Sequence, residues 1–353
     1  DIADALTREQ SVLLRAIDAL PRVEIRGGAG SGKTFLALEQ ARRLSRAGQR
    51  VALICYSHGL AGYLKRVTGG WRRREQLAYV GEFHALGVEW GAPVGPDERV
   101  RSEETVHWWE VELPRLMAEL ADQLPDGKKF DAVIVDEAQD FADQWWRPVI
   151  GALRDGENGR LLIVGDAGQS VFERAGRPPV DLVPLVLDHN LRNTRQIASA
   201  SLPRVGQGME LRGGTGPGVR YVEVGAGEDL VAAGDDEAVR LLDEGWEPRD
   251  VALLVTGSRH PMQVELQKEG NDAYWETFWD GEDIFYGHVL GFKGLERPAV
   301  VLVCNHHDHV DRLRERIYVG LSRATDVLVV VGDAEAIEAA AATPDSGAHH
   351  HAG

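Results

Sequence analysis

The chain has 353 residues, of which 43% are hydrophobic and 27% charged, and its formal net charge is −17. This composition is typical of a globular protein of about two domains, and the acidic balance argues against a generally basic, nucleic-acid-coating surface. No apolar run approaches the roughly 20 residues that span a bilayer, which excludes a membrane-spanning helix. The two cysteines, Cys55 and Cys304, lie inside apolar runs, so we expect a cytoplasmic protein without a disulfide framework.

The N-terminus lacks the basic and apolar segments of a signal peptide. It also lacks an initiator Met, so we expect a piece of a longer chain. Helical patterns separate a series of nearly continuous apolar runs, which is typical of strands buried on both faces of a parallel sheet. Helices are expected at Phe35–Ala47, before Gly48, and at Val264–Glu269, before Gly270. The expected strands are Val23–Ile25, Val51–Tyr56, Ala132–Val135, Leu161–Val164, Val219–Val224, Val251–Thr256, Ala299–Cys304 and Val327–Val331.

Strands that alternate with helices predict an α/β fold with right-handed crossovers. A turn-rich stretch at Arg174–Pro184 precedes a Gly- and Pro-rich stretch at Leu202–Gly218, which is typical of a long loop. We therefore place a domain boundary near residue 185. The predicted domains are 1–185 and 186–335, and residues 336–353 form an Ala-, Gly- and His-rich tail that we expect to be disordered.

The segment Gly27–Thr34, GGAGSGKT, fits the phosphate-binding pattern G-x-x-x-x-G-K-[ST]. It follows an expected strand and opens an expected helix, which is the context that the pattern requires. Glycines allow backbone amides to approach phosphates, and the helix N-terminus adds its dipole. Lys33 is expected to reach the β- and γ-phosphates, and the Thr34 hydroxyl is expected to ligate Mg²⁺. The sequence therefore predicts a nucleoside triphosphate site with Mg²⁺ as its metal.

The segment Ala132–Asp140, AVIVDEAQD, ends an apolar strand in two carboxylates. The carboxyl ends of strands are where ligands bind in open α/β folds. Asp136 is expected to hold Mg²⁺, directly or through water. Glu137 is expected to polarise the attacking water. An apolar run that ends in Asp-Glu is a weak signal by itself, but beside a phosphate loop it is a strong one.

With these segments the chain resembles a superfamily 1 helicase of the UvrD/Rep type, from about residue 6 to residue 332. The resemblance implies two RecA-like domains of the P-loop NTPase fold, with ATP between them and single-stranded DNA as the partner. The remaining motifs follow in family order: Leu6–Gln10, Val51–Leu60, Glu82–His84, Ile163–Ser170, Asn190–Arg192, Phe292–Glu296 and Tyr318–Ala324.

The resemblance assigns roles to particular residues. Gln169 would sense the γ-phosphate, and Arg192 and Arg323 would be arginine fingers that neutralise the transferring phosphoryl group from across a cleft. Gln10 would read the adenine edge, and Glu296 would approach the ribose. The whole expected nucleotide contact set is Gln10, Gly28, Gly30, Ser31, Gly32, Lys33, Thr34, Phe35, Gly294 and Glu296.

The resemblance also implies a strand-binding surface across the tops of both domains, which supplies aromatic and polar contacts. A buried packing role is the alternative for Phe83 and Phe172. The expected contacts are Tyr56, Ser57, His58, Phe83, His84, Phe172, Arg174 and His288.

The sequence departs from the family pattern at several of these positions. Leu191 replaces the usual aromatic that stacks on adenine, and Phe35 replaces an Arg, so base selectivity is open. His288 and Leu290 replace a Thr-x-His pair, and Arg174 replaces a Trp that stacks a base. The short spacing before Asp136 leaves room only for a small helical insertion at about residues 90–130.

Two other segments carry chemistry-bearing residues. Lys65–Arg74 holds five positive charges and Trp71, as either a solvated loop or a nucleic-acid contact. The Cys304–His309 cluster is either a metal site or a polar loop. We favour the loop, because neighbouring residues of a strand rarely share one ion.

Two classes of function remain open. The first is an ATP-driven helicase or translocase on DNA, with 3′-to-5′ movement implied by the resemblance alone and RNA as the other substrate. The second is an ATPase switch that gates a nuclease or partner in a bacterial repair or defence assembly, where an N-terminal nuclease domain outside this chain is one candidate. A small-molecule kinase would explain the phosphate loop but not Gln169, Arg192 and Arg323.

Overall fold

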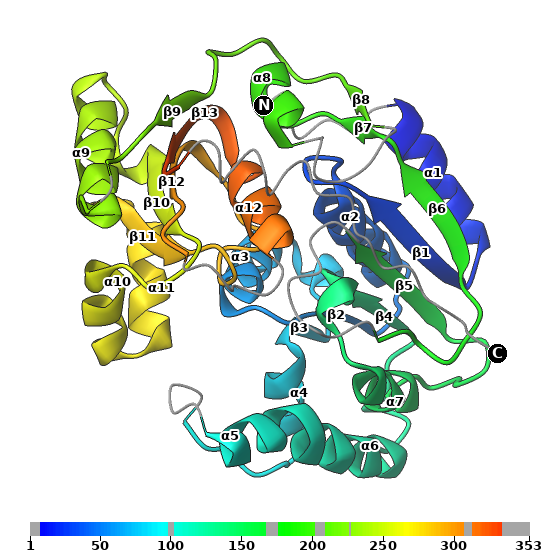
Figure 1. Cartoon of the computed structure of the whole chain (residues 1–353). Helices are drawn as coiled ribbons and strands as arrows, with labels where there is room; N and C mark the ends of the chain where they lie inside the picture. The colour runs from blue at the N-terminus through cyan, green and yellow to red at the C-terminus, as the bar shows by residue number, and fades with distance from the viewer. Residues whose placement is uncertain are drawn as a thin grey trace, which may run out of the picture.

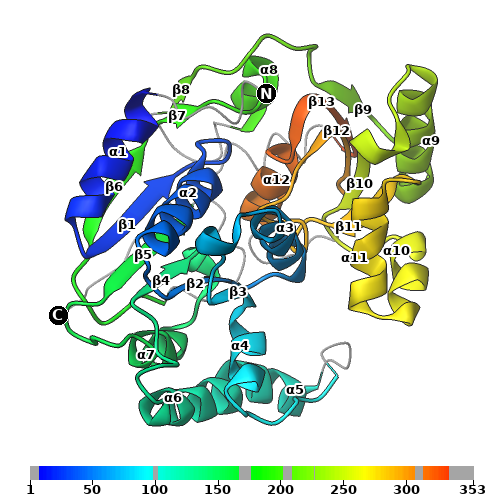
Figure 2. The ribbon, with the colours of Figure 1, turned by 180° about the vertical axis from the view of Figure 1, so that it is seen from behind.

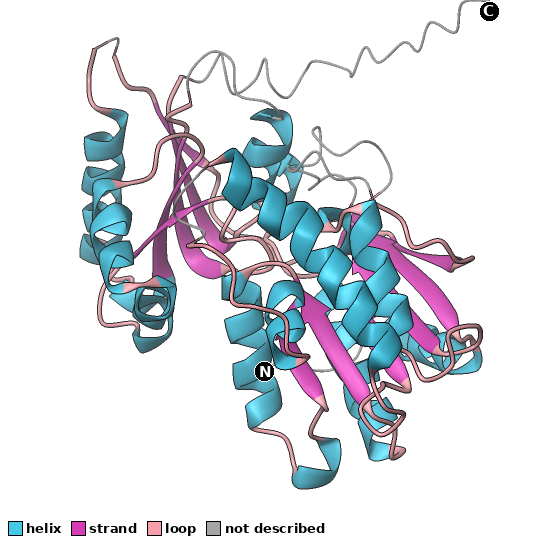
Figure 3. Cartoon of the chain, turned by 90° about the horizontal axis from the view of Figure 1, so that it is seen from below, coloured by secondary structure: helices cyan, strands magenta, loops and turns pink. Residues whose placement is uncertain are grey.

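The computed structural model describes residues 8–97, 102–166, 176–201, 209–225, 227–306 and 313–333. Two parallel β-sheets lie side by side, and helices cover them (Figures 1 and 2). Figure 3 shows strands of both sheets between layers of helices. The predicted α/β class, with parallel sheets flanked by helices, is confirmed.

The first sheet has six strands in the order β3-β2-β4-β5-β1-β6, and its described pairs are parallel. β1 lies inside the sheet, so its carboxyl end, where the phosphate loop begins, is supported by strands on both sides. The strands are β1 (Arg22–Gly27), β2 (Val51–Cys55), β3 (Tyr79–Glu82), β4 (Ala132–Val135), β5 (Arg160–Gly165) and β6 (Val183–Leu187).

The second sheet has five strands in the order β11-β10-β12-β13-β9, again in parallel pairs. A short parallel pair, β7 with β8, lies near the phosphate loop. The strands are β7 (His189–Asn190), β8 (Glu210–Leu211), β9 (Arg220–Val222), β10 (Val251–Val255), β11 (Phe285–His288), β12 (Arg297–Val303) and β13 (Ala324–Val331).

Helices connect the strands and cover the faces of the sheets. The described helices are α1 (Arg8–Ala19), α2 (Lys33–Arg46), α3 (His58–Gly69), α4 (Phe83–Glu89), α5 (Glu103–His107), α6 (Leu113–Gln123), α7 (Trp146–Gly151), α8 (Arg195–Ser201), α9 (Leu230–Asp243), α10 (Pro261–Leu266), α11 (Asn271–Asp280) and α12 (Leu313–Leu321).

Alternate residues of each central strand enter different hydrophobic cores. In β4, Val133 and Val135 pack with the helices beneath one face, whereas Ala132 and Ile134 pack with α1 and α2 on the other. The second sheet is divided in the same way. Because side chains of a strand point alternately to opposite faces, a strand buried on both sides must be apolar at every position. This explains the continuous apolar runs of the sequence.

The element boundaries differ from the sequence prediction in places. All eight expected strands occur, and β6 runs across the expected domain boundary at residue 185. The region expected to hold a small helical insertion contains α5, a π-helical segment at Trp108–Glu112, and α6. The tail at residues 336–353 lies outside the described residues. In the described part of the chain, no helix has the length and apolar character needed to cross a membrane.

Candidate nucleotide-binding site

The loop between β1 and α2 has the conformation of a phosphate cradle. Gly30 and Gly32 have φ angles of 72° and 87°, in the left-handed region that glycine adopts without a Cβ penalty. Gly32 precedes α2 and has no side chain, so no side chain caps the first amides of the helix. Uncapped amides and the helix dipole make such a helix start a binding site for an anion.

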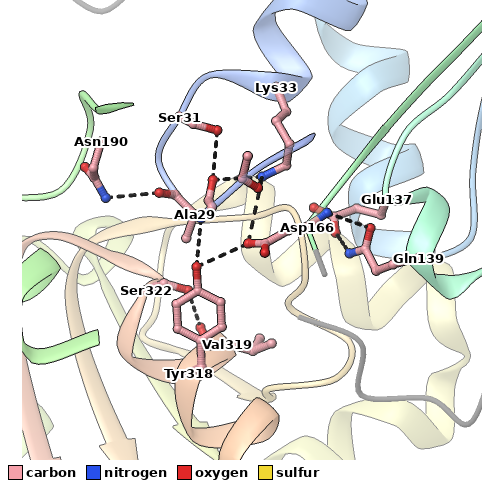
Figure 4. A network of polar contacts seen from close by, with 12 residues as sticks. Ala29, Ser31, Lys33, Glu137, Gln139, Asp166, Asn190, Tyr318, Val319 and Ser322 are labelled. Carbon is pink, nitrogen blue, oxygen red and sulfur yellow. Dashed lines mark hydrogen bonds and ion pairs between the residues drawn. The ribbon is translucent and has the colours of Figure 1, made fainter. Parts of the chain in front are cut away.

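Lys33 lies in the first turn of α2 and reaches back over this loop. Its Nζ donates hydrogen bonds to Gly27 O at 2.8 Å and to Gly28 O at 2.9 Å (Figure 4). The same atom lies 3.9 Å from Asp166 Oδ2, at the end of β5. Lys33 is buried, so its ammonium group is held against the loop and close to an acidic side chain.

Asp136 follows β4 and is completely buried. Its Oδ1 accepts a hydrogen bond from Glu137 N at 2.9 Å, whereas its Oδ2 is buried without a hydrogen-bond partner. Burial, together with the neighbouring Glu137 carboxylate, raises the pKa of Asp136 to about 7. The Thr34 side chain lowers this pKa and so offsets part of the increase. A buried oxygen without a partner is the feature that a bound cation would satisfy.

The donor set fits Mg²⁺. This ion binds in proteins through one or two carboxylates and completes its shell with waters and substrate phosphates. Thr34 and Asp136 supply a hydroxyl and a carboxylate, and the hydroxyl is near enough to lower the pKa of Asp136. No group of three or more His, Cys, Asp or Glu that could hold a metal occurs within the residues that the structure describes.

Glu137 has a backbone φ of 54°, and it is the one described residue other than glycine with a positive φ. A left-handed backbone at a non-glycine residue costs energy and often marks a functional site. Burial opposes ionisation of Glu137 and would raise the pKa of its carboxyl group. A larger, opposite effect comes from the positive charges of Lys293, Lys33 and Arg323, so the pKa is lowered. Glu137 is thus a buried, ionised carboxylate surrounded by cations from both sheets.

Gln139 positions Glu137 and was not among the predicted site residues. Its Nε2 donates to Glu137 Oε2, and its Oε1 accepts from Asp166 N at 3.1 Å. The side chain therefore joins the ends of β4 and β5 (Figure 4). Its place two residues after Glu137 was visible in the sequence, but spacing alone does not show where an amide points.

Residues near the second sheet bind the phosphate loop directly. Tyr318 of α12 accepts a hydrogen bond from Ala29 N at 2.9 Å and donates one to Asp166 Oδ2 at 3.2 Å. Asn190 of β7 donates from Nδ2 to Ala29 O at 3.0 Å, and Leu191 N donates to Gly30 O at 3.1 Å. Figure 4 shows Tyr318 and Asn190 reaching the loop from separate segments.

The two predicted arginine fingers lie on this side of the site. Arg323 is buried; its guanidinium donates to Val319 O at 2.9 Å, Leu295 O at 3.3 Å and Ser322 Oγ at 2.8 Å. Burial lowers the pKa of Arg323, and the Glu137 carboxylate opposes that effect most strongly. The charge of Arg323 therefore acts on Glu137 through space, while its hydrogen bonds are made to groups of its own side of the site.

Arg192 is half-exposed and forms an ion pair with Glu296. The expected ribose contact and the expected finger thus contact each other in this structure. Both side chains are more than one-third exposed, and exposed pairs of this kind are worth about 1 kcal/mol or less. Little energy is therefore needed to release Arg192 toward a phosphate.

A buried ion pair joins the two sheets beside Glu137. Lys293 Nζ lies 2.5 Å from Asp140 Oδ1, and the two side chains are 1% and 2% exposed. Lys293 follows β11, and Asp140 ends the short 3₁₀ helix after β4. Both residues lie inside motifs of the sequence, but neither was predicted as a site residue.

The remaining expected nucleotide contacts are distributed unevenly. Gln10 of α1 lies against the loop, since a Cβ on Gly32 would come within 2.5 Å of Gln10 Nε2. Ser31 Oγ donates to Gly28 O at 2.8 Å. Phe35 is half-buried beside them in the first turn of α2. Gly294 packs elsewhere, because a Cβ there would meet Leu60 of α3 at 2.9 Å.

Three expected strand contacts follow β2. Tyr56 is half-buried and packs against the Trp145 ring. The Ser57 hydroxyl caps α3 by accepting from Leu60 N at 3.4 Å. His58 is partly exposed, and its Nδ1 lies 2.6 Å from Glu82 Oε2.

The Phe83 ring does not agree with the expected strand contact. Phe83 is 1% exposed and stacks on Trp145 with ring centroids 5.0 Å apart and an interplanar angle of 12°. A ring buried in this way packs the core and offers no face to a base. His84 is half-buried in the same aromatic cluster, 4.8 Å from the Trp145 ring.

The other expected contacts lie at the second sheet or outside the described residues. His288 Nε2 lies 3.0 Å from Gly257 O, and its Nδ1 accepts from Leu290 N at 3.1 Å, so backbone groups engage both ring nitrogens. Gln169, Phe172 and Arg174 lie outside the described residues.

The Cys304–His309 cluster is described only as far as His306. Gly257 N donates to Asn305 Oδ1 at 2.8 Å, and His306 Nδ1 lies 3.2 Å from Thr256 Oγ1. These contacts tie the ends of β10 and β12 together.

Comparison with known proteins gives one family match. Residues 14–174 match the family model of an AAA domain, which covers less than half of the chain. No curated protein sequence matches the chain. The match spans the phosphate loop and five of the six strands of the first sheet.

Two viral helicases are among the similar solved structures. The PRRSV helicase is 14% identical over 91% of this chain and 54% of that one, with a TM-score of 0.48. Arterivirus nonstructural protein 10, a helicase, is 14% identical over 93% of this chain and 63% of that one, with a TM-score of 0.44. This chain thus spans about half to two-thirds of the length of these two proteins. Because both TM-scores are below 0.5, the function proposed below is argued from the residues of this chain's own site. The phosphate loop, the carboxylate strand and the parallel sheets are those of a P-loop NTPase fold.

Proposed function

We propose that this protein is an ATP-dependent DNA helicase or translocase, which hydrolyses Mg-ATP between its two sheets and couples hydrolysis to movement on single-stranded DNA. The observation that carries the proposal is the convergence on Glu137 of Lys33 from the first sheet and of Lys293 and Arg323 from the second. Because groups of both sheets keep the Glu137 carboxylate ionised, its electrostatic environment depends on the distance between the two sheets. The resemblance to the UvrD/Rep group supports DNA as the substrate and 3′-to-5′ as the direction.

Each group has a role in the proposed hydrolysis. Lys33 and the loop amides would bind the phosphates, and Thr34 and Asp136 would hold Mg²⁺, whose charge would offset that of the phosphate oxygens. Glu137 orients the attacking water and accepts its proton, while Gln139 fixes the Glu137 carboxylate. Positioning and charge stabilisation supply most of the catalysis in phosphoryl transfer.

The arginines complete the site from the second sheet. Arg323 already faces Glu137, and Arg192 would exchange its exposed pair with Glu296 for the γ-phosphate. Arginine fingers are worth roughly 10³–10⁵ in rate. Gln169 remains an expected γ-phosphate sensor on the resemblance alone.

Coupling to a strand would run through contacts at the carboxyl ends of the strands. The proposed contacts are Tyr56, Ser57, His58, His84 and His288, with Phe172 and Arg174 implied by the resemblance. Small changes in the separation of the sheets would move the first-sheet contacts relative to His288. This is how hydrolysis would advance a bound strand.

The second candidate is an ATPase switch that gates a nuclease or another partner without moving along a strand. The net charge of −17 and the burial of Phe83 favour this alternative, because both reduce the grip on a strand. The two candidates share the hydrolytic site and differ in their response to nucleic acid.

The test is steady-state ATP hydrolysis without nucleic acid, with single-stranded DNA and with single-stranded RNA. We expect strong stimulation by DNA in the parent. Glu137→Gln should retain ATP binding and lose turnover by about 10²–10⁴-fold, as expected on loss of a general base. Glu157→Gln, the same change in an exposed loop, should behave as the parent.

Parental turnover in Glu137→Gln would contradict the assigned hydrolytic site. Strong hydrolysis that DNA barely stimulates would support the switch instead. Stronger stimulation by RNA than by DNA would correct the substrate.

A further inference from the structure

A cluster of arginines lies on the first domain away from the nucleotide site. We call it the arginine patch: Arg42 and Arg46 of α2, and Arg72, Arg73 and Arg74 around the 3₁₀ helix Arg73–Glu75. The last three side chains are exposed. In a chain with a net charge of −17, this is a local reversal of sign.

One carboxylate neutralises only part of the arginine patch. Glu75 Oε2 lies 3.0 Å from Arg42 Nη2, and Glu75 Oε1 lies 2.7 Å from Arg46 Nε. Arg72, Arg73 and Arg74 form no ion pair with any residue that the structure describes. Burial opposes ionisation of Glu75, but the hydrogen bonds from Arg46 and Arg42 lower the pKa of its carboxyl group to about 2, so Glu75 is held as a carboxylate by those two arginines alone among the side chains of the patch.

The arginine patch is built on a fixed backbone rather than on a solvated loop. Ser45 Oγ donates to Gln76 O at 2.8 Å, which ties the segment to α2. Gln76 Nε2 donates to Trp71 O at 2.7 Å and to Thr68 O at 3.2 Å. The Arg42 guanidinium lies over the Trp71 ring, 5.6 Å from its centroid. A charged surface held in this way loses little conformational entropy when it binds.

The arginine patch lies at the amino-terminal ends of the strands of the first sheet, and the nucleotide site lies at their carboxyl ends. The phosphate loop precedes α2, whereas Arg46 ends this helix of 14 residues. At 1.5 Å per residue, the two ends are about 20 Å apart. Ala78 N donates to Val51 O at the start of β2, so the patch segment reaches the amino-terminal edge of the strands.

We propose that the arginine patch is a second nucleic-acid contact, which binds the phosphate backbone of duplex DNA without reading its sequence. Planar guanidinium groups match phosphate oxygens in a bidentate geometry. Duplex DNA is the occupant because it carries one charge per roughly 1.7 Å of axis, so several exposed arginines on one rigid surface can contact phosphates at the same time. The inference rests on the proposed function because it takes DNA as the substrate. The proposed single-strand contacts lie at the carboxyl ends of the strands, at the opposite end of the first sheet from the arginine patch.

The experiment compares two triple variants of the full chain with the same change in charge. One replaces the exposed arginines of the patch, as Arg72→Gln, Arg73→Gln and Arg74→Gln. The control replaces exposed arginines elsewhere, as Arg115→Gln, Arg147→Gln and Arg249→Gln. Fluorescence anisotropy measures binding to a blunt duplex about two helical turns long, at salt concentrations from about 50 to about 200 mM.

Each phosphate contact adds about 0.9 to the slope of log affinity against log salt on duplex DNA. The parent and the control triple should therefore lose about 40-fold more affinity over this range than the patch triple, if three contacts are lost. ATP turnover stimulated by a short single strand should be the same in all three proteins.

Equal salt slopes in the two triples would overturn the proposal. The proposal would also be overturned if polyglutamate displaced the labelled duplex as effectively as unlabelled duplex does, because the occupant would then be an acidic protein. Loss of strand-stimulated turnover in the patch triple alone would also overturn it, because the patch would then belong to the strand path. A parent without strand stimulation that still binds duplex through the patch would refute the translocase and support this contact.

Discussion

Glu137 combines features that rarely coincide at one residue. It is buried, it has a left-handed backbone, and cations from both sheets lower the pKa of its carboxyl group. Backbone strain at a non-glycine residue persists only where surrounding contacts fix it. Here the hydrogen bonds of Gln139 and the packing at the end of β4 provide those contacts.

At this scale the sequence identifies the groups proposed to bind phosphate and Mg²⁺ better than the groups that position them. Lys33, Thr34, Asp136 and Glu137 follow from two local patterns, and the structure places them together. Tyr318 could not be assigned in this way, because its hydroxyl meets Ala29 only when α12 approaches the phosphate loop. Phe83 is buried because Trp145, distant in sequence, stacks on it.

Glu75 should make stability depend on pH in the acid range. Its pKa of about 2 in the folded protein lies below the ordinary value of 4.5. A depressed folded-state pKa contributes stability above the unfolded-state value, and this stability is lost as pH falls from about 4.5 toward 2. We expect urea unfolding to show that the parent loses more stability than Glu75→Gln between about pH 5 and about pH 3. The same pH dependence in both proteins would contradict this.

At the scale of elements, the strands that the sequence missed in the two large sheets are edge strands, and the others are the two-residue strands β7 and β8. β3 and β6 end the first sheet, and β11 ends the second. An edge strand is partly exposed, so it needs no continuous apolar run, and β3 (YVGE) and β11 (FYGH) have none. The sequence of β6, VPLVL, is apolar, although Val183 and Val186 are exposed. Pro184 also marked this stretch as a turn, but an edge strand tolerates proline. This is why the expected boundary at residue 185 falls inside β6.

The insertion shows a further feature that periodicity does not predict. The π-helical turn at Trp108–Glu112 changes the internal hydrogen bonding of the helix. The Glu110 carbonyl there accepts from Trp145 Nε1 at 3.2 Å and from Gln144 Nε2 at 2.9 Å. Trp145 is the ring that packs on Tyr56 and His84. The insertion is therefore joined to the proposed strand contacts.

The contact of α12 with the phosphate loop can be tested by Tyr318→Phe. Loss of the buried hydroxyl leaves Ala29 N and Asp166 Oδ2 without this partner. An unsatisfied buried group costs about 1–3 kcal/mol. Urea denaturation should show a loss of this size, whereas Tyr221→Phe, at an exposed tyrosine of β9, should leave stability unchanged. Equal stabilities in the two variants would show that the hydroxyl contributes nothing to the contact.

At the scale of the whole molecule, separate contacts hold the sheets together around the site. Lys293 pairs with Asp140 beside Glu137. At α3, a Cβ on Gly59 would meet the Trp275 ring of α11 at 2.5 Å, so the two helices pack closely. Arg66 Nη2 donates to Glu276 Oε1 at 2.7 Å across the same contact. A change in the site can therefore reach α3, which begins at the proposed strand contact His58.

The Lys293–Asp140 pair should be strongly coupled. Removing one partner of a buried ion pair leaves an unpaired charge and typically costs about 3–5 kcal/mol. We expect Lys293→Met to lose about this much in unfolding free energy, and Lys293→Met with Asp140→Asn to lose less than the sum of the single changes. Strictly additive losses in this double-mutant cycle would show that the pair does not join the sheets energetically.

The central claim is that one hydrolytic site is built from both sheets. It is tested most directly by ATP turnover, in the presence of single-stranded DNA, of Arg192→Gln and Arg323→Gln, with nucleotide binding measured by a fluorescent analogue and folding checked by thermal unfolding. We expect both variants to bind nucleotide nearly as well as the parent and to lose turnover by roughly 10³–10⁵-fold. Parental turnover in both folded variants would contradict the claim, because hydrolysis would then need the first sheet alone.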